Sequence, residues 1–340
     1  MSEDLTPTIS VQEISIQELF SEISDVTVVY NDPPWEALSQ VLPTPTLAIS
    51  AWNMDIEHLE EIASTTHATS TVVGVGGGTA LDTAKFLAWK HGSTLIQVPT
   101  ITSVDAGFTD AIGVRVNGNV QYVGKIMPKM VVLDIPLIRS APKHLNRAGV
   151  GDILSCHTGL FDWKLAIDAK QEDRWSENLY ALGSSLLDEL EVAIRDIGAV
   201  TESGVRFVAD AYRRIGAACA VAGHSRFEEG SEHFLVYALE HATGDHYVHG
   251  EVVAMGVTAM ASVQGNDVDR VRKIVSLSGV RANPLDIGVS QQQFFESLKS
   301  LAEYTTREKL DYSIVNTHDI TESEISAAWN TVTSLPRVNI

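Results

Sequence analysis

The chain has 340 residues, of which 44% are hydrophobic and 20% charged, as expected of a globular protein with a sizeable core. Its 44 acidic and 24 basic residues give a formal net charge of −20, which argues against a surface that binds nucleic acid or an anionic membrane. Two cysteines do not make a disulfide framework, the polar N-terminus has no apolar signal region, and no segment approaches the roughly 18 apolar residues that span a bilayer. We therefore expect a cytoplasmic protein that is not inserted in a membrane.

The first part of the chain alternates between strand and helix patterns. Residues 1–10 are polar and predict a loose tail. Apolar runs predict strands at 27–30, 46–50, 71–75, 94–98 and 130–134. Helical periodicity predicts helices at 56–64 and 80–89. Asn117-Gly118 predicts the turn of a hairpin between 114–116 and 120–123. Because strands that alternate with helices form a largely parallel sheet, we predict an α/β domain over residues 1–143.

The second part of the chain has only helical patterns. They cover residues 144–170, 176–200, 203–222, 229–243, 250–264, 267–279 and 291–304. We therefore predict an all-helical domain over residues 144–340.

Three consecutive glycines, Gly76, Gly77 and Gly78, follow the predicted strand 71–75 and precede a helix. Glycines let the main chain approach a ligand closely, and a helix N-terminus offers N–H groups and partial positive charge to a pyrophosphate. The pattern differs from the G-x-G-x-x-G fingerprint of dinucleotide-binding proteins. Asp82 and Lys85 lie one turn apart on the new helix. They are predicted either to form an ion pair on the surface or to support the loop.

A carboxylate and two imidazoles form a possible metal site in the predicted helical domain. Asp152 ends the segment Gly-Val-Gly-Asp, His233 ends Gly-Ser-Glu-His, and His249 begins His-Gly-Glu. Three protein ligands of these types suit zinc, nickel or iron and leave positions for a substrate oxygen or water. Taken singly, each histidine is more often structural.

The ordered motifs GGGTALDTAK, VPTITSVDAG, AGVGDILSCHTGLFDWKLA, GSEH and HGE resemble those of the iron-containing alcohol dehydrogenase superfamily, and most closely its glycerol-1-phosphate dehydrogenases. A late segment, TREKLDYSIVN, is similar to the closing motif of that family. The resemblance implies a dehydroquinate synthase-like fold, in which a Rossmann-like domain precedes a helical domain. It also implies a homo-oligomer, an NAD(H) or NADP(H) cofactor and one divalent metal ion.

The resemblance assigns roles to further residues. Its metal ligands correspond to Asp152, His233 and His249, and its pyrophosphate loop to Gly76, Gly77 and Gly78. Asp105 corresponds to an aspartate that faces the substrate, and residues that contact the cofactor correspond to Thr100, Ser103 and Lys125; we add Asp82 beside the loop. Asp32 follows the first predicted strand, where relatives often carry an acidic residue for the adenosine ribose, and its charge would repel a 2′-phosphate and favour NAD.

Two positions depart from the glycerol-1-phosphate enzymes. Cys156-His157 stands near an expected asparagine, and Val104-Asp105-Ala106 replaces a segment similar to His-Asp-Gly, both where substrate is expected. Cys156 is expected to be a buried small hydrophobe rather than an extra ligand, and His157 and His246 to be structural rather than proton relays. We expect Trp163 in the core and Asp162 and Lys164 solvated or paired. Glu232 and Glu251 both adjoin the candidate ligand histidines in sequence and are candidates to support them.

These observations predict a metal-dependent dehydrogenase that interconverts a small polyol and its ketone, best matched by dihydroxyacetone phosphate and sn-glycerol 1-phosphate. Glycerol or another hydroxy-ketone is an alternative substrate. A sugar-phosphate cyclase of the dehydroquinate synthase type is a rival, although its carboxylate ligand is typically Glu and it needs more basic residues for phosphate. A catalytically inactive, nucleotide-binding relative is a second rival, which the three intact ligand positions disfavour.

Overall fold

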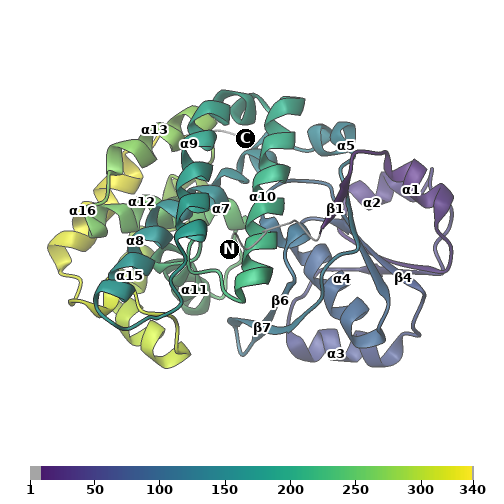
Figure 1. The fold of residues 1–340 in the computed structure, drawn as a ribbon, viewed down its shortest axis with the longest axis horizontal. Coiled ribbons are helices and arrows are strands. Elements are labelled where there is room, and N and C mark those ends of the chain that lie inside the picture. Colours follow the sequence, from purple (N-terminus) through teal and green to yellow (C-terminus); the bar gives the residue numbers. More distant parts are fainter. Residues whose placement is uncertain (1–8, 339–340) are drawn as a thin grey trace. The chain divides into compact units, whose positions relative to one another are not determined.

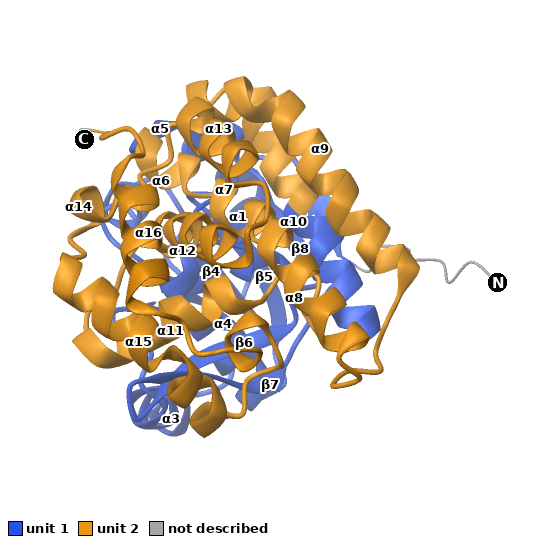
Figure 2. Cartoon of the chain, turned by 90° about the vertical axis from the view of Figure 1, so that its left-hand side faces the viewer, with its two compact units in different colours: residues 1–142, 212–223 blue, residues 143–211, 224–340 orange. Residues whose placement is uncertain are grey.

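The computed structural model describes residues 9–338 (Figure 1). The chain divides into two compact units, coloured separately in Figure 2. The first, called here the sheet unit, holds the residues up to Pro142 together with Tyr212–Gly223. The second, the helical unit, holds Lys143–Ala211 and the chain from His224 onward.

The sheet unit is built on six parallel strands in the order β1-β8-β5-β4-β2-β3. One face is packed by α1 and α2 through Leu19 and Trp35, and the other by α3 and α4 through Leu59 and Phe86. Burial on both faces explains the continuous apolar runs of the central strands. The elements are β1 (Ser10–Gln12), α1 (Ile16–Glu22), β2 (Val26–Tyr30), α2 (Pro34–Leu38), β3 (Leu47–Ser50), α3 (Ile56–Thr65), β4 (Thr71–Gly76), α4 (Gly78–His91), β5 (Thr94–Pro99), η1 (Asp105–Phe108), β6 (Ala111–Val116), β7 (Asn119–Lys125), β8 (Met130–Val132) and α5 (Ile135–Ser140).

The predicted parallel sheet and hairpin are confirmed, and the N-terminal prediction needs correction. Strands β6 and β7 form a separate antiparallel pair, with Asn117 and Gly118 both at positive φ in its turn. The predicted tail ends earlier than residue 10, because Ser10 begins β1 and pairs with Met130 of β8. A three-residue strand is too short for a periodic signal. Residues 1–8 lie outside the described part of the chain.

The helical unit contains only helices and turns within its described residues. They are α6 (Lys143–Arg147), α7 (Val150–Leu154), α8 (Cys156–Asp168), α9 (Glu177–Ala199), α10 (Glu202–Ala222) as far as Ala211, α11 (Ser231–Thr243), α12 (His249–Gln264), α13 (Val268–Ser278), α14 (Pro284–Ile287), α15 (Gln291–Glu308), η2 (Ile314–Asn316) and α16 (Glu322–Thr333). The segment 144–170, predicted to be helical, is helical but is divided into α6, α7 and α8. The breaks fall at Gly149 and Ser155, residues with a lower helix propensity than alanine or leucine.

Among the residues described, no helix combines the length and apolar character needed to cross a bilayer.

Candidate functional site

The glycine loop lies where β4 passes into α4, in the sheet unit. Gly76 has φ of +155°, a backbone conformation that L residues rarely adopt, and a β-carbon there would collide with the Asn31 side chain. Asn31 Oδ1 accepts a hydrogen bond from Gly77 N at 3.0 Å, while Asn31 Nδ2 donates to Ala51 O at 2.8 Å. The loop is therefore braced by a residue that follows β2. The next residue, Asp32, which the resemblance assigns to the adenosine ribose, is exposed.

The start of α4 is shaped to accept an anion. Gly77 is its N-cap and provides no side-chain cap for the first turn, so that turn presents backbone N–H groups and the positive end of the helix dipole. Thr100 and Ser103 are buried beside the loop, where Thr100 N donates to Gly76 O at 3.0 Å. A β-carbon at Gly77 would lie 3.0 Å from Ile101 Cδ1, so this segment packs directly on the loop.

Asp82 and Lys125 form ion pairs inside the sheet unit. Lys85 is fully buried and places Nζ 3.0 Å from Asp82 Oδ1, while it also donates to Ala111 O at 2.8 Å. Burial raises the pKa of Asp82, and the adjacent Lys85 opposes that rise. Lys125 is more than half exposed and lies 3.6 Å from Asp110. The Asp82–Lys85 pair thus ties α4 to β6.

Asp105, expected to face the substrate, begins the short helix η1 in the sheet unit. Val104 before it is in extended backbone, and its Cγ1 would lie 3.0 Å from a β-carbon at Gly78. Asp105 is thus adjacent in sequence to a residue that packs against the glycine loop.

Asp152, His233 and His249 converge within the helical unit. Each offers one ligand atom, and these atoms all lie within 4.8 Å of one another. Asp152 Oδ1 is 3.2 Å from His249 Nε2, and the two imidazole rings are 5.4 Å apart between centroids. Asp152 and His233 are buried, whereas the His249 side chain is 32% exposed, so the cluster is accessible from its His249 side.

Glycine contacts between helices bring these three side chains together. A β-carbon at Gly151 would lie 2.6 Å from Gly250 Cα and closer still to Gly250 O, so the backbones of α7 and α12 touch beside Asp152 and His249. A β-carbon at Gly256 would lie 2.8 Å from Glu232 O, which places α12 equally close to the helix that carries His233. Gly151 in the Gly-Val-Gly-Asp motif and Gly256 in α12 are therefore needed for this close packing.

The surroundings of the two imidazoles favour a cation. Glu232 is fully buried, and its Oε1 accepts a hydrogen bond from Gly230 N at 2.6 Å and lies 2.9 Å from His233 Nδ1. Burial lowers the pKa of His233, but the hydrogen bond and charge of Glu232 outweigh it and raise that pKa to about 10. Burial likewise lowers the pKa of His249, and Asp152 raises it overall. A divalent cation bound through His233 Nε2 would replace the proton that this negative charge attracts.

The other candidate residues of the helical unit have different surroundings. Glu251 is buried but its Oε2 lies 3.4 Å from Arg281 Nη1, so Glu232 rather than Glu251 contacts a histidine of the cluster, His233. Cys156 is fully buried, and burial raises the pKa of its thiol well above the usual value. His157 Nε2 lies 2.8 Å from Asn266 O, and burial lowers its pKa. His246 is exposed in the turn between α11 and α12.

Comparison with known proteins gives related dehydrogenases. Residues 36–142 match the family described as iron-containing alcohol dehydrogenase. Glycerol-1-phosphate dehydrogenase (NAD(P)+) of Hyperthermus butylicus is 32% identical over 252 residues, which cover 73% of this chain and 71% of that protein. The enzyme of the same name from Pyrobaculum islandicum is 36% identical over 235 residues, or 67% of this chain and 68% of that protein.

Solved structures share the fold at lower identity. A probable glycerol dehydrogenase from Sinorhizobium meliloti superposes with a TM-score of 0.73 at 18% identity, covering 96% of this chain and 97% of that one. Glycerol dehydrogenase from Schizosaccharomyces pombe gives a TM-score of 0.68 at 20% identity, covering 97% and 89%. The predicted combination of a parallel-sheet domain and a helical domain is thereby confirmed.

Proposed function

Because this chain belongs to the iron-containing alcohol dehydrogenase family and is an oxidoreductase, we propose that it interconverts dihydroxyacetone phosphate and sn-glycerol 1-phosphate with NAD(H) or NADP(H) and one divalent metal ion. The convergence of Asp152, His233 and His249 carries the proposal. A sugar-phosphate cyclase of the dehydroquinate synthase type is disfavoured, because its carboxylate ligand is typically Glu and the carboxylate here is Asp152. The phosphate on the substrate is inferred from the names of the relatives at 32–36% identity.

The residues of the metal centre have separable tasks. Asp152, His233 and His249 would hold the ion, and Glu232 would fix the His233 ring so that Nε2 faces it. A bound divalent ion supplies Lewis acidity that polarises the substrate oxygen. The exposed side of His249 would admit the substrate, while burial of Asp152 keeps the other side of the centre dry.

The residues of the glycine loop bind rather than react. Gly77, Gly78 and the first turn of α4 would hold the pyrophosphate, Asn31 would keep the loop in its observed shape, and Thr100 and Ser103 would line the cofactor beside it. The hydride chemistry belongs to the nicotinamide. We infer a preference for NAD over NADP from Asp32, whose exposed carboxylate would repel a 2′-phosphate.

The test is oxidation of NADH or NADPH with dihydroxyacetone phosphate, beside dihydroxyacetone, after the protein is stripped of metal and supplied with zinc, nickel or ferrous iron. Metal-dependent turnover of the phosphate ester is expected, and the His249→Ala variant should lose it while still binding cofactor. Turnover of dihydroxyacetone alone would change the substrate assignment. Full activity without metal, or in the His249→Ala variant, would contradict the proposed chemistry.

A further inference from the structure

Two sequence motifs that have no direct part in the proposed chemistry meet at one buried carboxylate. Asp162 lies on α8 within the DWKLA motif and is fully buried, so the expectation that it is solvated or ion-paired is wrong. Its Oδ2 accepts a hydrogen bond from Ser231 N at 2.8 Å, and its Oδ1 accepts one from Ile314 N at 2.8 Å. One carboxylate thus joins the first residue of α11 to the first residue of η2, which belongs to the late DYSIVN motif.

The contact at Ser231 lies two residues before His233. Gly230 separates Asp162 from Glu232, because a β-carbon there would lie 2.9 Å from Asp162 Oδ2 and 3.1 Å from Glu232 Oε2. Gly230 N also donates to Glu232 Oε1, the oxygen that faces His233 Nδ1. A continuous set of short contacts therefore runs from Asp162, through the N-terminal turn of α11, to the His233 ring.

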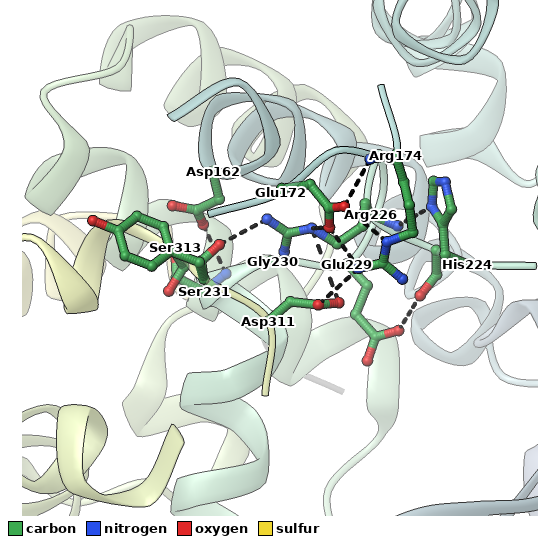
Figure 3. Close-up of polar contacts among 12 residues, drawn as sticks. Asp162, Glu172, Arg174, His224, Arg226, Glu229, Gly230, Ser231, Asp311 and Ser313 are labelled. Atoms are coloured by element: carbon green, nitrogen blue, oxygen red, sulfur yellow. Dashed lines mark hydrogen bonds and ion pairs between the residues drawn. The ribbon is translucent and has the colours of Figure 1, made fainter. Parts of the chain in front are cut away.

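An ionic cluster holds the two segments that Asp162 joins. Arg226 is 1% exposed and donates to Tyr312 O at 2.7 Å, next to Ser313 and Ile314. Its guanidinium lies near the carboxylates of Glu172 and Asp311 (Figure 3). Arg174 Nη2 pairs with both carboxylates, 2.5 Å from Glu172 Oε2 and 2.9 Å from Asp311 Oδ1. The segment 311–314 is therefore fastened both to the turn that precedes α11 and to α8.

We propose that Asp162 is a positioning residue for the metal centre, which holds the first turn of α11 and so fixes Glu232 and His233 in the geometry that binds the ion. The inference rests on the proposed metal site. It gives the DWKLA and DYSIVN motifs one shared task, since each supplies one side of the same clamp. A buried carboxylate that accepts two backbone N–H bonds fixes both segments more firmly than a neutral side chain would.

The experiment compares zinc affinity in the full-length protein by competition with a chromophoric chelator. Asp162→Asn keeps the size of the side chain but cannot accept both N–H bonds. It should raise the zinc dissociation constant about tenfold, which is the low end of the loss in metal affinity seen when a residue that supports a metal ligand is replaced. The visible spectrum of the cobalt-loaded variant should also shift, because the His233 ring would be held differently. Gly230→Ala, whose β-carbon would displace Asp162 or Glu232, is the second variant and should act in the same direction.

Asp134→Asn is the matched control. Asp134 is also buried, and it also accepts two backbone N–H bonds, from Ile16 at 2.9 Å and Leu137 at 3.0 Å, but it lies in the sheet unit. It should lower the unfolding temperature without changing zinc affinity or the cobalt spectrum. Unchanged zinc affinity and cobalt spectrum in both Asp162→Asn and Gly230→Ala would overturn the inference and leave the metal site intact. Failure of the wild-type protein to bind zinc would instead refute the proposed function itself.

Discussion

The glycine loop of the sheet unit and the metal cluster of the helical unit are built in opposite ways. The loop offers mainly backbone groups from consecutive residues, and the Asn31 side chain braces it through a hydrogen bond. The cluster offers only side chains, from Asp152, His233 and His249 on three different helices. The loop therefore depends on backbone angles that glycine permits, whereas the cluster depends on how closely helices pack.

This difference separates the ways in which each site can fail. A substitution that disturbs helix packing should remove the metal and leave the cofactor loop unchanged. A substitution that disturbs the loop backbone should weaken cofactor binding and leave metal binding unchanged. The variants below test that separation, from the largest expected effect to the smallest.

Gly151→Ala should have the largest effect. Its β-carbon would collide with the backbone of Gly250, which cannot move aside by rotating a side chain, so α7 and α12 must separate beside Asp152 and His249. We expect destabilisation of about 1–3 kcal/mol, typical of overpacking, and loss of measurable zinc binding. Denaturant unfolding and chelator competition measure the two effects.

Gly183→Ala serves as its control, because the three atoms nearest to a β-carbon there all belong to the flexible side chain of Leu160, the first at 3.2 Å. It should retain zinc affinity. Normal zinc binding by Gly151→Ala would show that contact between the helix backbones does not assemble the cluster.

Gly76→Ala tests the other region. The residue has φ of +155°, and its new β-carbon would strike Asn31, so the loop must leave its observed conformation. Strain of this kind is worth about 1–3 kcal/mol, so NADH affinity, measured by nicotinamide fluorescence, should fall roughly 5- to 150-fold. Zinc affinity should stay at the wild-type value. A parallel loss of zinc binding would mean that the two sites are not independent.

The loop could be predicted from sequence because its parts are neighbours along the chain. A strand, three glycines and a helix start are recognisable in one short window, and the structure confirms each element. The bracing by Asn31 could not be predicted in the same way. It depends on β2 pairing with β4 and β3, which places Asn31 beside Gly77 and Ala51, and only the pairing reveals which of Asn31 and Asp32 contacts the loop.

The cluster of Asp152, His233 and His249 could be predicted from residue types and from resemblance, but not every residue that we propose supports it could be. Glu232 adjoins a ligand in sequence and was among the candidates. Asp162 was misjudged because its two partners lie 69 and 152 residues away, so no local pattern shows that the carboxylate is buried. The final helix α16 was also missed, although Thr321 and Glu324 form a capping box that sequence could have shown.

Asp32→Asn should alter cofactor choice. Removing the exposed negative charge after β2 should raise affinity for NADPH relative to NADH roughly five- to tenfold, because a 2′-phosphate would no longer be repelled at short range. The shift should shrink at high salt. Glu36→Gln, which removes an exposed charge from α2 of the same unit, should leave the ratio unchanged. An unchanged ratio in Asp32→Asn would place the ribose elsewhere.

Glu172→Gln should have the smallest effect, and its pH dependence identifies its cause. The hydrogen bonds from Arg174 lower the pKa of Glu172 from 4.5 to about 2, so the folded state favours the ionised carboxylate. The stabilisation is complete above about pH 4.5 and is lost as the pH falls toward 2. Because Arg174 is 45% exposed, solvent screening limits the difference in unfolding free energy to about 1 kcal/mol at pH 6. The difference in unfolding free energy between the wild type and Glu172→Gln should narrow steadily between pH 4.5 and 3. A difference that stays constant over this range would show that the helical unit depends on the shape of the Glu172 side chain rather than on its charge.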